Sequence, residues 1–198
     1  MKKIAVYGGS FDPPHKGHRL LAENLAKACD AQKVIVIPAA LSPFKSSSSA
    51  SAQERLEMCK LLFNDSLFDV SDIEISRGGK SYTVETLRMI KEMHPDSRLY
   101  LFMGDDMFLS FNRWYKYKEI CELATIVCAC RSGKAGLLDE MRSFAEREIG
   151  LSGNEIIICE AEPIEISSTE LRGADDEMKK RYLDAKVFDY IKKRGLYE

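Results

Sequence analysis

The chain has 198 residues and a formal net charge of −2, with 29 Lys and Arg against 31 Asp and Glu. This balance excludes a protein that coats nucleic acid through a basic surface, but it allows a local basic pocket for phosphates. The length suits a single domain over residues 1–198, with a small C-terminal helical part over 165–198. Such a chain can bury a sizeable core without disulfides.

The N-terminal residues carry no apolar segment of the signal-peptide type, and no apolar run is long enough to span a membrane. We therefore expect a cytoplasmic protein with no membrane partner. The six cysteines lie inside apolar segments, without C-x-x-C pairs or histidines at zinc-binding spacing. We expect them to be reduced core thiols, and we expect no metal site built from the protein alone.

Strand and helix patterns alternate along the chain. In chain order we expect a strand over 2–7, a helix over 16–29, a strand over 33–38, a loop over 41–51, a helix over 52–63, a strand over 68–75, a helix over 81–93, strands over 98–103 and 124–130, a helix over 137–149, a strand over 155–159 and a helix over 184–194. The expected inward positions are Leu20, Leu21, Leu25 and Ala28 in the first helix, Leu56, Cys59 and Phe63 in the second, and Tyr82, Leu87, Met89 and Ile90 in the third.

Repeated β-α-β units predict an α/β fold with a doubly wound, Rossmann-like parallel sheet and helices on both of its faces. In such sheets, ligands bind beyond the carboxyl ends of the strands, where the strand order reverses. We therefore expect the strand ends at Gly8-Gly9, Pro38-Ala39 and Gly104-Asp105-Asp106 to line one crevice.

The first strand end is the sequence Gly8-Gly9-Ser10-Phe11. A glycine directly after a strand can adopt positive φ and lets a ligand approach the backbone closely. Taken alone, the two glycines favour a tight turn without further function. The pattern matches neither G-x-G-x-x-G nor G-x-x-x-x-G-K-[ST], which excludes a simple dehydrogenase or a P-loop protein.

Two of the three histidines, His15 and His18, flank Lys16-Gly17 at the expected start of the first helix. Their spacing puts both on one face, and a helix N-terminus favours anions. Imidazole N–H groups could then donate to phosphate oxygens as charge builds up. A zinc pair and a pair of structural histidines are the alternatives, and phosphate binding is favoured because no third zinc ligand is evident. His94, at a helix end, is expected to be structural.

A second cluster reads Ile166-Ser167-Ser168-Thr169-Glu170-Leu171-Arg172 and marks a helix start. A plain N-cap is one interpretation, and it is favoured when the cluster is taken alone. The other is a second phosphate-binding helix N-terminus, with Arg172 reaching back to phosphate.

Together, residues 8–18 and 166–172 resemble the H-x-G-H and I-S-S-T-x-x-R motifs of a nucleotidyltransferase superfamily. Within it, the chain is most similar to the bacterial nicotinate-nucleotide adenylyltransferases. The similarity includes Arg77 to Leu87 (R-x-G-x-S-Y-T-x-x-T-L), Gly104 to Tyr115 (G-x-D … F-x-x-W) and Tyr190 to Tyr197 (Y-I-x-x-x-G-L-Y). It runs through nearly the whole chain in order.

The resemblance implies adenylyl transfer from ATP to nicotinate mononucleotide, which gives deamido-NAD and pyrophosphate without a covalent enzyme intermediate. It implies catalytic roles for His15, His18, Lys45 and Arg172. It implies ATP binding by Gly8, Gly9, Ser10, Phe11, His15, His18, Gly104, Asp106, Ile166, Ser167, Ser168, Thr169 and Arg172. It implies acceptor binding by Tyr82, Thr83, Asp106, Trp114 and Tyr115, with Tyr82 and Thr83 holding the carboxylate at a helix start and Trp114 stacking on the pyridine ring. Mg²⁺ would be carried mainly by the ATP phosphates and water.

One stretch departs from the family pattern. The family usually has asparagine after the second strand and then a P-H-K triplet, whereas this chain has Ala39 and Ala40 and then Pro43-Phe44-Lys45. Adenylyl transfer is therefore better supported than the identity of the acceptor. A sibling enzyme with another phosphorylated acceptor and a nucleotide-binding module without turnover are the alternatives. Homo-oligomer formation and the preference for nicotinate or nicotinamide stay open.

Overall fold

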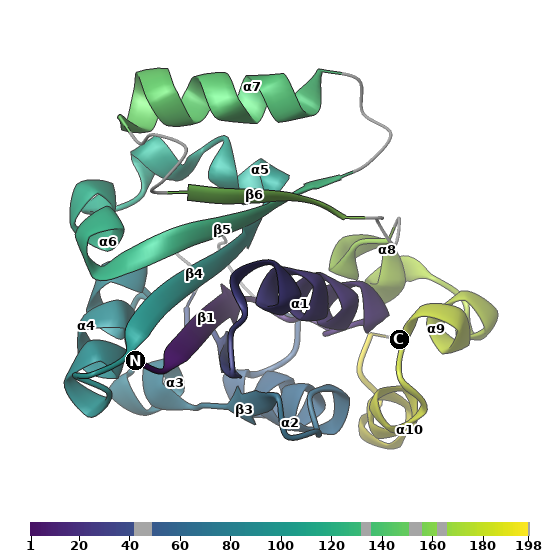
Figure 1. The fold of residues 1–198 in the computed structure, drawn as a ribbon. Helices are drawn as coiled ribbons and strands as arrows, with labels where there is room; N and C mark the ends of the chain where they lie inside the picture. The colour runs from purple at the N-terminus through teal and green to yellow at the C-terminus, as the bar shows by residue number, and fades with distance from the viewer. Residues whose placement is uncertain (42–48, 132–135, 151–155, 162–165, 198) are drawn as a thin grey trace. The chain divides into compact units, whose positions relative to one another are not determined.

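The computed structural model describes residues 1–41, 49–131, 136–150, 156–161 and 166–197. Its strands are β1 (Lys3–Gly9), β2 (Lys33–Pro38), β3 (Phe68–Val70), β4 (Arg98–Gly104), β5 (Ala124–Arg131) and β6 (Ile156–Ala161). Its helices are α1 (Lys16–Cys29), α2 (Ala52–Leu62), α3 (Ile73–Arg77), α4 (Thr83–Met93), α5 (Asp105–Phe108), α6 (Tyr117–Leu123), α7 (Leu137–Phe144), α8 (Ser168–Gly173), α9 (Asp176–Tyr182) and α10 (Ala185–Arg194), with short turns η1 (Phe111–Arg113) and η2 (Ala145–Ile149) (Figure 1).

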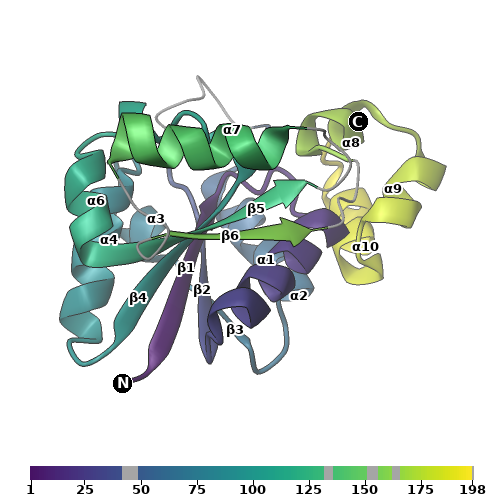
Figure 2. The same ribbon diagram turned by 45° about the horizontal axis from the view of Figure 1, so that its top comes forward.

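The strands form a six-stranded sheet in the order β3-β2-β1-β4-β5-β6. Strand β1 pairs in parallel with β4, β4 with β5, and β5 with β6. The arrows of β5 and β6 accordingly run side by side in the same direction in Figure 2. Parallel neighbours require crossover connections, which the helices supply. The predicted α/β fold is confirmed, and the strand order is the Rossmann order.

The chain divides into two compact units, each built from separate segments. The first unit comprises Met1–Tyr7, Leu21–Val34 and Tyr82–Pro163. The second unit comprises Gly8–Leu20, Ile35–Ser81 and Ile164–Glu198. The single domain expected from the sequence stays a prediction.

The core of the first unit is formed by the central strands. Residues Leu99 to Met103 of β4 are each at most 3% exposed, and Ile126 to Cys128 of β5 are fully buried. Uninterrupted apolar strands of this kind are typical of parallel sheets covered on both faces. Each fully buried Leu, Ile or Phe side chain contributes about 1.5–3 kcal/mol through removal of apolar surface from water.

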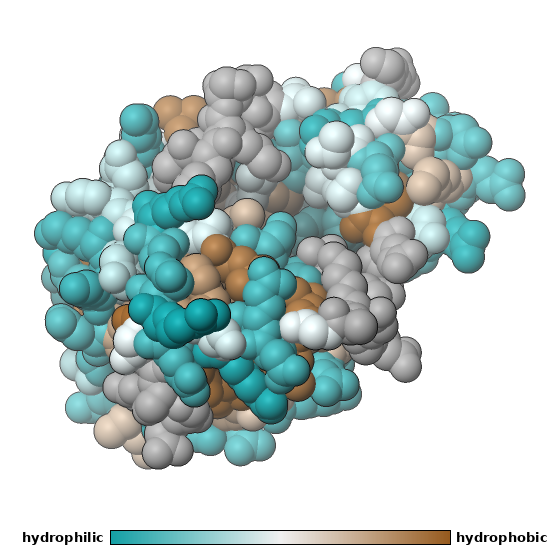
Figure 3. All heavy atoms as spheres, turned by 90° about the horizontal axis from the view of Figure 1, so that it is seen from above, coloured by the Kyte–Doolittle hydropathy of each residue, from teal (hydrophilic) through white to brown (hydrophobic). Residues whose placement is uncertain are grey.

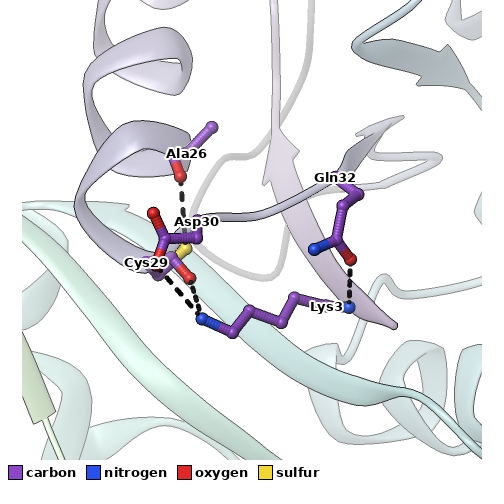
Figure 4. Close-up of polar contacts among 5 residues, drawn as sticks. All are labelled: Lys3, Ala26, Cys29, Asp30 and Gln32. Atoms are coloured by element: carbon purple, nitrogen blue, oxygen red, sulfur yellow. Dashed lines mark hydrogen bonds and ion pairs between the residues drawn. The ribbon is translucent and has the colours of Figure 1, made fainter. Parts of the chain in front are cut away.

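The start of β1 is fastened to the end of α1 by polar contacts (Figure 4). The backbone N–H of Lys3 donates to Oε1 of Gln32 at 2.8 Å, and its Nζ donates to the carbonyl of Cys29 at 3.0 Å. The same Nζ lies 3.4 Å from Oδ2 of Asp30, a residue with positive φ. One lysine therefore ties the strand to the turn in which α1 ends.

The expected strand over 68–75 is wrong in its second half. Strand β3 stops at Val70, and α3 begins at Ile73. The N–H of Ser71 donates to the carbonyl of Val36, and Asp72 then occupies the N-cap position of α3. The apolar alternation through Ile73 and Ile75 is too short to distinguish a strand from a helix. Ser71 and Asp72, the two polar residues between β3 and α3, mark the place where the strand ends and the helix begins.

Other helix and strand bounds agree with the expectations to within about two residues, which is the ordinary uncertainty of helix and strand ends. In α1, the expected inward position Ala28 is wrong, because Ala28 is exposed and the buried residues are Ala22, Leu25, Ala26 and Cys29. The expected helix over 137–149 is divided into α7 and the π-helical turn η2.

The six cysteines are free, and four of them are buried. Burial raises the pKa of the Cys59 and Cys128 thiols, as expected for core residues. Over the described ranges, the helices include none that is long and apolar enough to cross a membrane. Hydrophilic side chains cover most of the face drawn in Figure 3, with smaller apolar areas between them.

Candidate active site

The histidine motif lies in the second unit, at the start of α1. The carbonyl of His15 accepts the N–H of His18 at 2.9 Å, which closes the first turn. The imidazole centroids are 3.7 Å apart and the rings are inclined by 34°, so the prediction that both lie on one face is confirmed. The backbone N–H of His15 donates to Nδ1 of His18 at 3.2 Å. Because Nδ1 of His18 accepts, the proton of the neutral ring is on Nε2, which is the donor nitrogen.

His15 is nearly inaccessible to solvent, with 4% of its surface exposed. Burial lowers the pKa of His15 to about 4, and the carboxylate of Glu170 opposes that shift only in part. Nδ1 of His15 is buried and has no hydrogen-bond partner among the described residues. A buried polar atom in this state costs about 1–3 kcal/mol, which a ligand oxygen bonded to it would recover. This nitrogen supports a ligand-binding role over a structural one.

Positive φ at Gly8 or Gly9 is not observed, because both residues continue β1. The residue with positive φ is Phe11, at 49°. A Cβ added to Gly9 would lie 2.9 Å from Cζ of Phe11, whereas one added to Gly8 would meet nothing within 4 Å. Gly9 therefore makes room for a side chain of the protein itself, the buried ring of Phe11.

The second motif begins α8 with a capping box. Oγ of Ser167 accepts the N–H of Glu170 at 3.1 Å, and the N–H of Ser167 donates to Oε2 of Glu170 at 2.8 Å. These hydrogen bonds lower the pKa of Glu170. Ser167 is therefore the N-cap of α8, and phosphate binding at this helix start stays a prediction. Ile166 is half-buried and Thr169 is exposed at the same helix start.

The two motifs meet on one loop, although about 150 residues separate them in the sequence. Oγ of Ser168 donates to the carbonyl of Pro13 at 2.9 Å. Nη1 of Arg172 donates to the carbonyl of Asp12 at 2.7 Å, and Nη2 donates to Oγ1 of Thr169 at 3.1 Å. The side chains predicted to hold phosphate thus hold the backbone immediately before His15. The two helix starts therefore lie at one loop, and their binding of one triphosphate stays a prediction.

The sequence analysis did not identify Asp12, whose carboxyl accepts three hydrogen bonds that hold this loop. Asp12 is 4% exposed, and its carboxyl accepts the N–H groups of Ser49 at 2.8 Å and Ala50 at 3.1 Å. The hydroxyl of Tyr197 donates to Oδ1 of Asp12 at 2.7 Å. The carbonyl of Tyr197 in turn accepts Nζ of Lys179 at 3.0 Å. The tyrosine that closes the family's last motif is thereby linked to the first motif.

Arg55 of α2 was also missed, although it is only 1% exposed. Its guanidinium donates to the carbonyls of Ser10 at 2.7 Å and Ala39 at 2.6 Å, with longer bonds to Ala40 and Ala50. Burial lowers the pKa of Arg55, and the carboxyl of Asp12 opposes that shift. Helical spacing from Arg55 to Cys59, an expected core residue, is the sequence pattern that could have revealed it.

The ends of β1 and β2 lie together, because the N–H of Ala39 donates to the carbonyl of Gly9 at 2.9 Å. The N–H of Ala40 donates to Oγ of Ser81 at 3.0 Å. Ala39 and Ala40, two of the three positions at which the chain departs from the family, are therefore fixed through their backbones. Phe44 and Lys45 lie outside the described residues.

The remaining candidates lie in the first unit. The rings of Tyr82 and Tyr115 are 4.9 Å apart, and Tyr82 is the N-cap of α4 without a side-chain hydrogen bond to it. Trp114 is half-buried and packs edge-on against Phe111, with centroids 5.4 Å apart. Asp106 is exposed in α5, two residues after Gly104. The structure brings Tyr82 and Tyr115 together, and Thr83 begins α4 as expected.

A family model described as cytidylyltransferase-like matches residues 6–174. A "probable nicotinate-nucleotide adenylyltransferase" of Aquifex aeolicus (strain VF5) is 41% identical over 168 residues, which cover 83% of this chain and 98% of the relative. A protein of the same name from Hydrogenobaculum sp. (strain Y04AAS1) is 34% identical, over 98% of this chain and 97% of the relative.

Among solved structures, a Plasmodium falciparum nicotinic acid mononucleotide adenylyltransferase complexed with NaAD has a TM-score of 0.77. It is 20% identical in sequence, and the match covers 100% of this chain and 98% of the Plasmodium chain. The same Plasmodium enzyme complexed with APC has a TM-score of 0.76 at 21% identity, over 100% of this chain and 98% of its own. These two structural similarities show that the chain shares the fold of the Plasmodium enzyme.

The Rossmann-like sheet, with two motif-bearing helix starts on one loop, defines a nucleotidyltransferase fold. The chain belongs to the cytidylyltransferase-like family and, within it, to the nicotinate-nucleotide adenylyltransferases.

Proposed function

We propose that this chain transfers the adenylyl group of ATP to nicotinate mononucleotide, in the biosynthesis of NAD. The observation that carries the proposal is the meeting of the two motifs, in which Ser168 and Arg172 hold the loop that leads into His15. Family membership supports the same reaction. Deamido-NAD and pyrophosphate are the products.

In the proposed reaction, a phosphate oxygen of nicotinate mononucleotide attacks the α-phosphorus of ATP. The bond from that phosphorus to the bridging oxygen of the β-phosphate breaks, and pyrophosphate leaves with the electron pair. No covalent enzyme intermediate is needed, so catalysis consists of positioning and electrostatic stabilisation. Nε2 of His18 would donate to an oxygen of the transferring phosphate. The buried nitrogen of His15 would bond to a neighbouring oxygen.

The other ATP contacts are proposed from their positions around this loop. Gly8, Gly9, Ser10 and Phe11 would offer backbone groups at the end of β1, and Ile166, Ser167, Ser168 and Thr169 would do so at the start of α8. Arg172 retains a guanidinium with five N–H donors, of which two are directed at Asp12 and Thr169. The proposal adds Lys45 for the β- and γ-phosphates, and Gly104 and Asp106 for the nucleoside.

The acceptor would bind in the first unit. The N-terminus of α4, at Tyr82 and Thr83, would receive the nicotinate carboxylate, because helix N-termini attract anions. Trp114 would stack on the pyridine ring, with Tyr115 beside it and Asp106 accepting a hydrogen bond. The contact between the rings of Tyr82 and Tyr115 supports this grouping.

Mg²⁺ is proposed as part of the substrate, Mg·ATP, with the phosphates and water as its ligands. The described residues include no group of three or more His, Cys, Asp and Glu side chains that could hold a metal ion. The ion would neutralise charge on the phosphates. Cytoplasmic location stays a prediction from the sequence, and so does the absence of nucleic-acid and membrane partners.

The test is pyrophosphate release from Mg·ATP with a panel of acceptors. We expect turnover with nicotinate mononucleotide and formation of deamido-NAD. Turnover with phosphopantetheine or nicotinamide mononucleotide, but not with nicotinate mononucleotide, would assign the chain to a sibling reaction. ATP binding without turnover across the panel would identify a nucleotide-binding module instead. The panel also shows which acceptor is used by a chain that has Ala39, Ala40 and Phe44 in place of the usual family residues.

A further inference from the structure

The position of His15 depends on how Asp12 is held. Asp12 is three residues before His15, and Pro13 and Pro14 stand between them with their φ angles fixed by the ring. The chain between the two residues is therefore stiff. A displacement of Asp12 would reach His15, and through the bond from His15 N–H to Nδ1 it would reach His18 as well.

The carboxyl of Asp12 has one side-chain donor among the described residues, the hydroxyl of Tyr197. The other donors to this carboxyl are the backbone N–H groups of Ser49 and Ala50. Without the hydroxyl, the bonds to Oδ1 from the described residues would be reduced to the 3.1 Å bond from Ala50. A buried carboxyl that loses a donor shifts toward any group that can replace it, since burial without hydrogen bonds is costly.

Tyr197 is itself held in place. Nζ of Lys179, a side chain that is 8% exposed, donates to its carbonyl, and its φ of 61° continues the turn that Gly195 begins with a φ of 62°. Burial and the bond to Asp12 raise the pKa of Tyr197, so the hydroxyl keeps its proton and stays a donor at neutral pH.

We propose that Tyr197 is a positioning residue for adenylyl transfer, because its hydroxyl holds Asp12 and Asp12 holds the loop that carries His15 and His18. The inference rests on the proposed function and extends it to a residue near the C-terminal end of the sequence. Tyr197 acts on the two histidines through its hydrogen bond to Asp12.

The first test compares Tyr197→Phe with Tyr190→Phe, a matched loss of a hydroxyl on α10. Both variants are assayed at a temperature at which circular dichroism shows them folded. Tyr197→Phe is expected to lower kcat by about tenfold to a hundredfold, the scale of a misplaced catalytic group, with KM for both substrates unchanged. Tyr190→Phe is expected to match the wild type. A wild-type kcat in folded Tyr197→Phe would overturn the proposal, even with a lowered Tm.

The second test reads the imidazoles directly, by long-range proton–nitrogen NMR of the three histidines. In Tyr197→Phe the ring signals of His15 and His18 are expected to move, while those of His94 serve as an internal reference and stay. Asp12→Asn is expected to move the same two sets of signals. If His15 and His18 give wild-type signals in Tyr197→Phe, the proposal fails, whatever happens to kcat.

These experiments separate the two proposals. If the wild-type protein forms no deamido-NAD, the proposed function fails, yet the imidazole signals still decide whether Tyr197 positions the histidines. If deamido-NAD forms and the signals do not move, only the role of Tyr197 is overturned.

Discussion

The ring of Phe11 lies edge-on to the imidazole of His18, with centroids 5.1 Å apart and planes at 71°. Phe11 reaches this position with a positive φ and occupies the space where Gly9 would carry a Cβ. Aromatic rings in this arrangement attract one another through ring edge and ring face. The orientation of a proposed catalytic side chain thus depends on a glycine two residues before the phenylalanine.

Gly9→Ala is therefore expected to force the Phe11 ring away and to destabilise the fold by about 1–3 kcal/mol, as overpacking does. It should also lower kcat, because His18 loses its neighbour. Gly8→Ala is the matched control, since a Cβ there meets nothing within 4 Å. Urea unfolding and steady-state kinetics of both variants are the measurements. Equal stability of the two alanine variants would contradict the packing described for Gly9.

His18→Ala is expected to lower kcat by about two to four orders of magnitude if Nε2 bonds to the transferring phosphate. The fold should survive, because His18 is only half-buried at the first turn of α1. Rates of pyrophosphate release are measured beside far-UV circular dichroism. Unchanged turnover would remove His18 from the reaction.

Stability should depend on pH through His15. Its pKa is about 4 in the folded chain and 6.5 in the reference state. Between these values the unfolded chain binds a proton that the folded chain does not, so stability falls as pH drops from 6.5 toward 4. At pH 4.5 the loss from this group is about 2–3 kcal/mol relative to pH 7.

The measurement is urea unfolding at both pH values, for the wild type and for His15→Gln. The variant should lack this part of the pH dependence, while His94→Gln, a change at the C-cap of α4, should retain it. A His15→Gln variant as sensitive to pH as the wild type would refute the lowered pKa.

Arg55→Met should destabilise the fold by at least about 3 kcal/mol, because buried carbonyls that lose their donor cost about 1–3 kcal/mol each. The affected carbonyls include those of Ser10 and Ala39, at the ends of β1 and β2. Lys60→Met on the same helix removes an exposed ion pair with Glu57 and should change stability by less than about 1 kcal/mol. Comparable losses in both variants would mean that the Arg55 contacts contribute little.

The sheet and both helix starts could be predicted from the sequence, because apolar runs and helix caps are local patterns. That the two motifs serve one site was implied by the family resemblance alone. The bond between Asp12 and Tyr197 could not be predicted, since it joins positions 185 residues apart. Arg55 was missed because a charged residue is ordinarily assigned to the surface. The positive φ of Phe11 was assigned to the glycines, because bulky residues rarely adopt it. Each miss lies where packing from distant segments overrides a local preference.

The bond between Asp12 and Tyr197 also has a consequence for how the molecule is made. Tyr197 is added to the growing chain 185 residues after Asp12, yet the carboxyl of Asp12 completes its hydrogen bonds with the hydroxyl of Tyr197. Contacts of such long sequence separation form late, because the intervening chain must first be ordered. A nascent chain of this protein would therefore carry His15 and His18 without this contact until position 197 has been added.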